Sequence, residues 1–262
     1  MPNTQMKEIN AILTIATRDF IKLLRDRTRL IFSLVFPFIF IGVLGSSLQA
    51  NVDLEYNFLT FVFIGVMAQT LFQSTASGII SLIEDRENDF SQEIFISPIS
   101  RYSIILGKIL GETLVAFVQI LGVLALGVIL QVPLDWAQLV TLAPFALIVA
   151  LFGGAFGVLI LANLGSQRSA NQIFPFIMFP QFFLAGVFNP IQELPPVLHF
   201  LSRISPMTYA VDLFRSVYYA ETPVFDQVVL FNTLNNLVVI GILFLLFFSI
   251  GTILFVRGER NR

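Results

Sequence analysis

Residues 136–167 read WAQLVTLAPFALIVALFGGAFGVLILANLGSQ and contain no Asp, Glu, Lys or Arg. An α-helix needs about 20 apolar residues to cross the roughly 30 Å hydrocarbon core of a bilayer, and this stretch is longer than that. No water is available inside a bilayer to bond backbone amides, so a helix is the expected conformation. Comparable stretches recur along the chain, and together they predict an all-α integral membrane protein with six transmembrane helices. The predicted spans are 30–52, 56–83, 101–134, 136–163, 169–190 and 227–256.

The composition supports a membrane protein and excludes several kinds of chemistry. Of the 262 residues 56% are hydrophobic and 12% are charged, whereas soluble domains have about 45–50% and about 25%. Cysteine is absent, which excludes disulfides, thiolate metal sites and cysteine nucleophiles. A single histidine, His199, leaves no histidine cluster for zinc, and the net charge of −2 gives no basic field for nucleic acid. We therefore expect a lipid bilayer as a partner, no metal and no nucleic acid.

The distribution of Lys and Arg predicts the orientation. With six spans, 13 of the 15 basic residues lie on one side of the membrane, and only Arg203 and Arg215 lie on the other. Cytoplasmic segments carry the excess of basic residues, so we expect both termini in the cytoplasm of a multi-pass protein of the cell (inner or plasma) membrane.

The segment before the first span predicts an amphipathic helix over residues 7–29. Apolar residues from Ile9 to Leu24 recur in steps of three and four, and Arg18, Lys22, Arg25 and Arg29 follow another face. Such a helix lies at the cytoplasmic membrane interface, with its cations near lipid phosphates. It is either a simple topological anchor or a docking surface for a cytoplasmic partner.

The link over residues 84–100 is unusually charged. It begins with Glu84, Asp85, Arg86, Glu87 and Asp89, and Pro98 follows. Pro98 disfavours helix at Ser97, so one helix should end there and another should begin near Ser100. The link could be a solvated turn, but its length and charge favour contact with a partner.

Two polar sets inside the spans are candidates for a substrate path or gate. Gln69 and Gln73 lie on one face of the second span. A side-chain amide inside a bilayer must face protein or a cavity, and a role in helix packing is the plainer interpretation. Lys108 and Glu112 lie one turn apart near the start of the third span. The plainer interpretation is that these side chains snorkel toward the membrane interface. An ion pair between them would stabilise the helix by at most a few tenths of a kcal/mol.

The segment 190–226 is too apolar for a free loop and too rich in proline for a straight span. Proline is favoured in the first turn of a helix, so we expect two short helices over 195–204 and 206–219. Irregular backbone at membrane depth must be buried in protein or face water, which favours a re-entrant helical hairpin on the outer side. Asp212 and Arg215 lie three residues apart on its second helix, where a local ion pair is expected.

These residues resemble the signature region of type-2 ATP-binding-cassette (ABC) exporter permeases. The matching positions are Gly186, Pro190, Leu194-Pro195, Pro206, Thr208, Tyr209, Asp212 and Arg215. The segment Ser97-Pro98-Ile99-Ser100 followed by Leu106-Gly107-Lys108 is similar to the family's cytoplasmic link, and the order of elements agrees over nearly the whole chain. The drug-resistance (daunorubicin-type) branch is the most similar. One departure is Glu87-Asn88-Asp89-Phe90, where many members carry Gly-Thr.

The resemblance implies one transmembrane permease domain over residues 1–262 in an exporter that moves a drug-like, lipid or glycan substrate out of the cytoplasm. It implies two permease chains, as a homo- or heterodimer, and two cytoplasmic ATPase subunits that hold ATP and Mg²⁺. The sequence itself contains no G-x-x-x-x-G-K-[S/T] motif. We therefore expect a transport subunit without catalytic residues, coupled to its ATPase through residues 7–29 and 84–100.

Other classes of function fit the residues less well. An ion-coupled secondary transporter or channel usually carries ionisable residues near the midplane of its spans, and the apolar stretches contain none. An intramembrane enzyme could be imagined from Ser205, His199 and Asp212, but no motif supports it. A pure scaffold is the remaining alternative.

Overall fold

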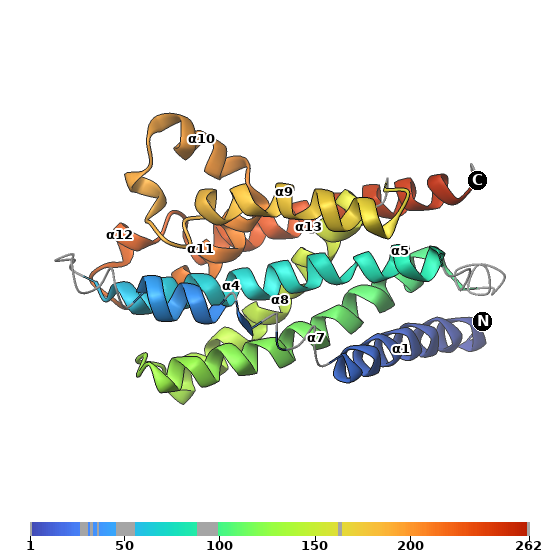
Figure 1. Cartoon of the computed structure of the whole chain (residues 1–262), viewed down its shortest axis with the longest axis horizontal. Coiled ribbons are helices and arrows are strands. Elements are labelled where there is room, and N and C mark those ends of the chain that lie inside the picture. The colour runs from blue at the N-terminus through green and yellow to red at the C-terminus, as the bar shows by residue number, and fades with distance from the viewer. Residues whose placement is uncertain are drawn as a thin grey trace.

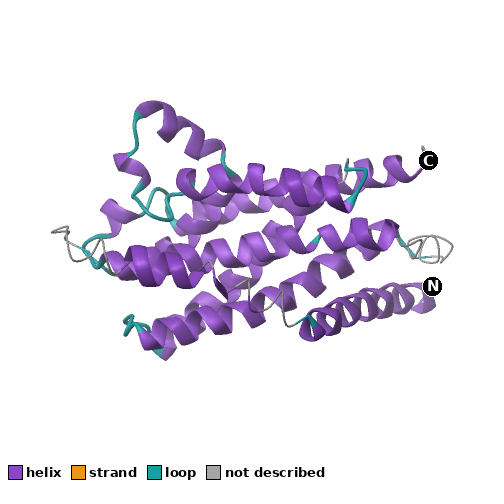
Figure 2. Ribbon diagram, in the orientation of Figure 1, coloured by secondary structure: helices purple, strands orange, loops and turns teal. Residues whose placement is uncertain are grey.

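The computed structural model describes residues 2–26, 31, 34–35, 37–45, 56–87, 99–161 and 164–260. Within these ranges the chain is helical and contains no strand, as expected for an all-α protein (Figure 2). The elements are α1 (Pro2–Arg25), the π-helix η1 (Phe40–Gly45), α4 (Phe58–Gly78), α5 (Ile80–Glu87), α7 (Arg101–Ile129), α8 (Trp136–Leu161), α9 (Gln167–Leu184), the 3₁₀ turn η2 (Ile191–Glu193), α10 (Pro196–Ile204), α11 (Pro206–Tyr218), α12 (Phe225–Val228) and α13 (Thr233–Arg260).

The long helices form one elongated bundle with α4 at its centre (Figure 1). Helix α4 packs against α7, α8 and α11, and nearly all of its residues are buried. Its approach to α8 depends on glycine, because a Cβ at Gly153 or Gly157 would lie 2.2 Å from the Phe72 carbonyl oxygen or 2.5 Å from that of Ala76. Small residues at this spacing allow two membrane helices to approach closely, so α4 and α8 form the core of the bundle.

Four helices in the described ranges are long and apolar enough to cross a membrane. They cover Phe58–Asp85, Arg101–Ile129, Trp136–Leu161 and Phe225–Gly258. Of the predicted first span, 30–52, the structure describes residues 31, 34–35 and 37–45, which are helical. The predicted fifth span, 169–190, corresponds to α9, which begins with the polar residues Gln167 and Arg168 and contains Pro175 and Pro180. The number of six spans therefore stays a prediction.

The charged link 84–100 begins within a helix, as expected of a helix that continues toward Pro98. Residues 84–87 are the end of α5, which directly continues α4 after the cap at Ile79. At the other end α7 begins at Arg101, directly after Ser100, close to the predicted position. Residues 88–98 of the link lie outside the described residues.

Helix α1 begins at Pro2, earlier than predicted, and runs beside α7 (Figure 1). The contact uses Gly107 and Gly111 of α7, where a Cβ would lie 3.1 Å from the carbonyl oxygens of Ile12 and Ala16 respectively. Helix α1 and the end of α5 lie at the same end of the bundle, on the right of Figure 1.

The segment 190–226 forms the two short helices expected from its prolines. They are α10 and α11, which begin at Pro196 and Pro206 and differ from the expected bounds by one residue at most at each end. Gly186 precedes them at φ +72°, a conformation that other residues rarely adopt. Helix α11 is buried in the bundle, whereas α10 stands off it at the end opposite α1 (Figure 1). Whether this hairpin re-enters a membrane stays a prediction.

Candidate functional site

A buried cluster of charges joins α1, α5 and α7. At its centre Lys108 of α7 is 1% exposed, and its Nζ lies 2.9 Å from Oδ2 of Asp19 and 2.5 Å from Oδ2 of Asp85. Lys108 also donates a hydrogen bond to the Ser81 hydroxyl at 3.3 Å, and Ser81 donates to Oε1 of Glu112 at 3.4 Å. A charge in a low-dielectric interior must be paired and hydrogen-bonded, and Lys108 is both. The cluster thus connects α1, α5 and α7, which are distant from one another in the sequence.

Two further pairs connect α1 with α5. Arg18 donates two hydrogen bonds to Asp85, of 2.7 Å and 3.1 Å, in the bidentate geometry that favours an arginine–carboxylate pair. Lys22 and Glu84 form an ion pair of 2.9 Å at the surface. Burial lowers the pKa of the Arg18 guanidinium, but its hydrogen bond to Asp85 and the nearby negative charges outweigh burial and raise the pKa above its ordinary value. Arg18 is therefore cationic at any physiological pH.

The local sequence explains why these charges meet. Ile15, Ala16 and Asp19 lie on the face of α1 that is buried against α7, and Gly111 leaves room for the Asp19 side chain at 3.1 Å. Asp19 is the member of the cluster that was not predicted. Its place on the apolar face of an amphipathic helix is the signal in the sequence, because a buried acid there requires a partner.

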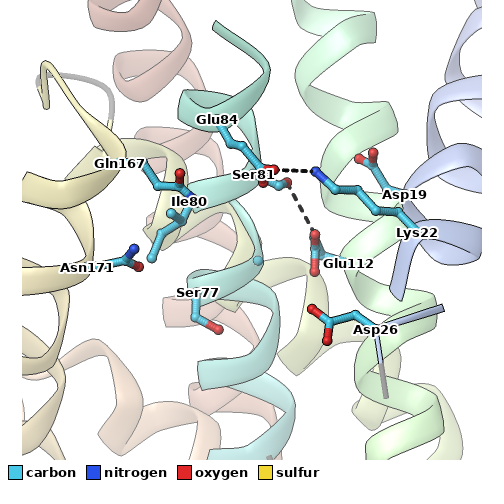
Figure 3. A pocket seen from close by; sticks show the side chains of 11 residues that line it. Asp19, Lys22, Asp26, Ser77, Ile80, Ser81, Glu84, Glu112, Gln167 and Asn171 are labelled. Atoms are coloured by element: carbon cyan, nitrogen blue, oxygen red, sulfur yellow. Dashed lines mark hydrogen bonds and ion pairs between the residues drawn. The ribbon is translucent and has the colours of Figure 1, made fainter. Parts of the chain in front are cut away.

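A cavity of about 390 Å³ lies beside the cluster, between α1, α4, α5, α7 and α9. Figure 3 shows Asp19 and Lys22 on one side of it, Gln167 and Asn171 on the other, and Glu112 reaching in from α7. Its other lining residues are Asp26, Ser77, Gly78, Ile80, Ser81 and Glu84. The cavity is therefore polar, and four of the five charged residues that line it are acidic. In the described part of the chain, no group of His, Asp and Glu is arranged to hold a metal ion.

The remaining predicted coupling residues are dispersed. Arg25 is exposed at the end of α1, and Glu87 accepts a hydrogen bond from the backbone amide of Gln167 at 3.0 Å, which connects α5 to α9. Asp89 and Pro98 lie outside the described residues, as does the side chain of Arg86.

The predicted path residues belong to two environments. Gln69 is 1% exposed and donates a hydrogen bond to Gln73 at 3.1 Å, so these two amides pair with each other along α4. Lys108 and Glu112 belong to the charged cluster instead. The expectation that Lys108 snorkels to the interface is wrong, because Asp19 and Asp85 bind its ammonium group inside the protein.

At the opposite end of the bundle, Asp212 of α11 fixes the start of α13. Its two carboxylate oxygens accept hydrogen bonds from the backbone amides of Leu230 and Phe231, both at 2.7 Å, and from Asn236 Nδ2 at 2.8 Å. The predicted local ion pair with Arg215 does not form, because these three donors occupy the carboxylate.

Arg215 instead connects three segments at the end of the bundle opposite α1. Its Nη2 donates to the carbonyl oxygen of Val187 at 3.1 Å, and its guanidinium lies 3.5 Å from the centre of the Phe61 ring. A Cβ at Gly65 would lie 2.9 Å from Nη2, so α4 provides space for this side chain. Tyr209 donates a hydrogen bond from its hydroxyl to the carbonyl oxygen of Arg203 and closes the junction between α10 and α11.

Comparison with known proteins identifies the family. The family model described as ABC-2 type transporter matches residues 10–219, which is most of the chain and includes most of α1, the charged cluster and helices α10 and α11. The chain belongs to the ABC-2 type transporter family. This ABC-2 permease is therefore a membrane protein of the transport class, and the cluster lies within the part that the family shares.

Individual relatives agree with this assignment. The ABC-2 permease is 25% identical over 216 residues to a transport permease named ycf38 from Cyanophora paradoxa, a match that covers 80% of this chain and 74% of the relative. It is 27% identical over 176 residues to YbhR of Escherichia coli K12, which is named a multidrug ABC transporter permease. That match covers 64% of this chain and 45% of YbhR, so the chain spans less than half of that relative.

Proposed function

We propose that this ABC-2 permease is the membrane-spanning subunit of an ATP-driven exporter, and that the charged cluster transmits the movement of a separate ATPase subunit to the bundle. The observation that carries the proposal is the pair of contacts that Lys108 makes with Asp19 and Asp85. These contacts join α1 and α5 to α7 at one end of the bundle. ATP and Mg²⁺ are held by the partner, of which two copies serve two permease chains. The chain is a transport subunit and not an enzyme.

The coupling follows from rigid connections. The link that begins in α5 contacts the ATPase, and a displacement of α5 pulls α1 through Asp85 and Arg18 and pulls α7 through Asp85 and Lys108. Packed helices move as units because their interfaces are bistable and not continuously deformable. The spans then tilt and the path opens outward, with α10 and α11 at the exit.

The finer features of the proposal follow the family and the relatives. Both termini lie in the cytoplasm of the cell membrane, and the six predicted spans and the outer re-entrant hairpin complete the permease. The name of YbhR and the resemblance to the daunorubicin-type branch support a drug-like substrate, with lipids and glycans as the other classes. Homodimer and heterodimer are both compatible with the fold.

Substitutions at Asp85 and Arg18 test the coupling. The chain has no cysteine, so a single Phe200→Cys substitution on the exposed α10 reports the state of the outer end through its reaction with a membrane-impermeant maleimide. In the complex with its ATPase, we expect the labelling rate to change when ATP and vanadate are added. Asp85→Asn should abolish that change, because it weakens the contacts of α5 with both Arg18 and Lys108. Arg18→Gln leaves the ion pair between Asp85 and Lys108 in place and should only reduce the change.

The exposed pair Lys22 and Glu84 provides the matched control. Lys22→Glu with Glu84→Lys exchanges the two charges at the same interface and leaves Lys108, Asp19 and Asp85 unchanged. If Asp85→Asn leaves the ATP-dependent change intact, the cluster is not the coupling element. If the unmodified complex shows no response to ATP but responds to an ion gradient, the chain is an ion-coupled transporter instead.

A further inference from the structure

Arg215 of α11 is a buried cation, 2% exposed, that forms no ion pair in the described part of the chain. Its Nη2 donates to the carbonyl oxygens of Val187 at 3.1 Å and Phe61 at 3.4 Å, whereas its Nε is buried without a hydrogen-bond partner. A guanidinium stays charged at any physiological pH, and a charge in a protein interior requires a partner. Two carbonyl oxygens meet this requirement only in part.

The nearest carboxylate on α11 does not neutralise Arg215. Both oxygens of Asp212 already accept hydrogen bonds of 2.7 to 2.8 Å from the first part of α13 and the residues before it. The Phe61 ring lies 3.5 Å from the guanidinium and attracts the cation through its face. This attraction leaves Nε without an acceptor, so the hydrogen bonding of Arg215 is incomplete within the described residues.

Two tyrosine side chains lie beside this guanidinium. Tyr219 follows Arg215 by four residues, so the two share one face of the helix, and the Tyr219 hydroxyl is also buried without a hydrogen-bond partner. The Tyr56 ring packs 5.2 Å from the same Phe61 ring that Arg215 covers. Tyr56 is within electrostatic range of both Arg215 and Tyr219. Because Tyr56 is half-buried, this group of donors extends from the interior to the surface.

We propose that Arg215, Tyr219 and Tyr56 form a binding site for a small oxyanion, namely a carboxylate, sulfate or phosphate group. The site offers one positive charge together with N–H and O–H donors. Two of these donors, Nε of Arg215 and the Tyr219 hydroxyl, have no acceptor among the described residues. Oxyanions accept several hydrogen bonds at once, and arginine is well suited to bind them. A bound oxyanion neutralises the buried charge and satisfies both donors.

The site lies at the end of the bundle opposite α1, where Arg215 joins α11 to α4 and to the turn at Val187 (Figure 1). An anion held there strengthens the contact among these segments, next to the exit in the proposed function. That consequence rests on the proposed function, whereas anion binding itself does not. A free inorganic anion and the anionic group of a larger molecule share this chemistry.

Binding of radiolabelled sulfate to the purified full chain in detergent tests the proposal. We expect saturable binding of a single sulfate per chain. Tyr219→Phe should weaken the affinity about tenfold, because it removes one hydrogen bond to a charged group. Tyr218→Phe is the matched control on the neighbouring residue. The Tyr218 hydroxyl donates to the carbonyl oxygen of Pro133 at 2.8 Å, so its removal should leave the affinity for sulfate unchanged.

Thermal unfolding of the same variants separates a ligand site from a structural role. Arg215→Gln also removes the contacts with Val187 and Phe61, so a loss of binding in that variant alone does not identify the site. Without sulfate, Tyr219→Phe should leave the unfolding midpoint unchanged or raise it, because a buried hydroxyl without a partner is costly. Tyr218→Phe should lower the midpoint equally with and without sulfate, since it removes a formed hydrogen bond.

Competition against bound sulfate identifies the source of the oxyanion. Displacement by inorganic phosphate but not by glycerol phosphate would support a site for a free anion. Displacement by both would support a site that also accepts the phosphate group of a larger molecule.

Three outcomes overturn the inference. The absence of saturable sulfate binding would show that the site takes no oxyanion. Equal affinities of Tyr219→Phe and the unmodified chain would exclude the Tyr219 hydroxyl from the site. Binding that occurs only in Glu193→Gln would show that Glu193, which is within electrostatic range of Tyr56, neutralises Arg215 instead. None of these readouts involves ATP or transport, so they stay interpretable if the proposed function fails.

Discussion

The ammonium nitrogen of Lys108 lies 2.9 Å from Oδ2 of Asp19, although 89 residues separate them in the sequence. Lys108 is 1% exposed and Asp19 is 4% exposed. Breaking a buried pair from one side leaves an uncompensated charge, which costs about 3 to 5 kcal/mol. The pair is therefore a strong determinant of how α1 is held on α7.

The first prediction concerns this pair. Lys108→Met should lower the thermal unfolding midpoint of the detergent-solubilised chain strongly, because Asp19 then stays buried without a cation. The double variant Lys108→Met with Asp19→Leu should recover most of the loss, since removing both charges removes the desolvation cost. A double variant as unstable as the single one would show that the effect of Lys108→Met does not arise from Asp19.

The second prediction concerns the exposed pair at the same interface. Lys22 and Glu84 have side chains that are 47% and 31% exposed, and such pairs contribute about 0 to 1 kcal/mol. Lys22→Gln should therefore shift the unfolding midpoint little, and the shift should shrink further in high salt. A loss as large as that of Lys108→Met would mean that burial does not determine the energetics of this cluster.

The third prediction concerns the approach of α4 and α8. A Cβ at Gly153 would lie 2.2 Å from the Phe72 carbonyl oxygen, so Gly153→Ala must push the helices apart and should cost about 1 to 3 kcal/mol. Gly241→Ala is the matched control, because nothing lies within 4 Å of its Cβ. It should be neutral or stabilising by up to about 1 kcal/mol, since alanine is the better helix former. The thermal unfolding midpoints of the two variants decide this, and equal destabilisation would contradict the close packing.

The fourth prediction concerns Asp212, at the end of the bundle opposite α1. Asp212→Ala removes the acceptor of two backbone amides and of Asn236, and each buried donor left unsatisfied costs about 1 to 3 kcal/mol. Asp212→Asn keeps the size and one acceptor oxygen, so its unfolding midpoint should lie between those of the alanine variant and the unmodified chain. Protease cleavage between α11 and α13 should increase in the same order. An asparagine variant as unstable as alanine would show that the carboxylate charge matters, and not the hydrogen bonds alone.

The sequence predicted local features well and long-range partners poorly. Pro195 and Pro206 placed the starts of α10 and α11 to within one residue, since a proline restricts the backbone around it. For Lys108 and Asp212 the nearest charges in the sequence, Glu112 and Arg215, were the obvious partners. Their actual ion-pair and hydrogen-bonding partners, Asp19 and the start of α13, depend on which helices pack together, and helical periodicity does not specify that.

The proposed function requires that the ATPase of this transporter is a separate subunit. The most direct test is affinity purification of the tagged chain from native membranes in a mild detergent, followed by mass spectrometry of the proteins that accompany it. We expect a stoichiometric partner that carries a G-x-x-x-x-G-K-[S/T] motif. Purification of an intact and abundant chain that reproducibly lacks any such partner would rule out a separate ATPase subunit.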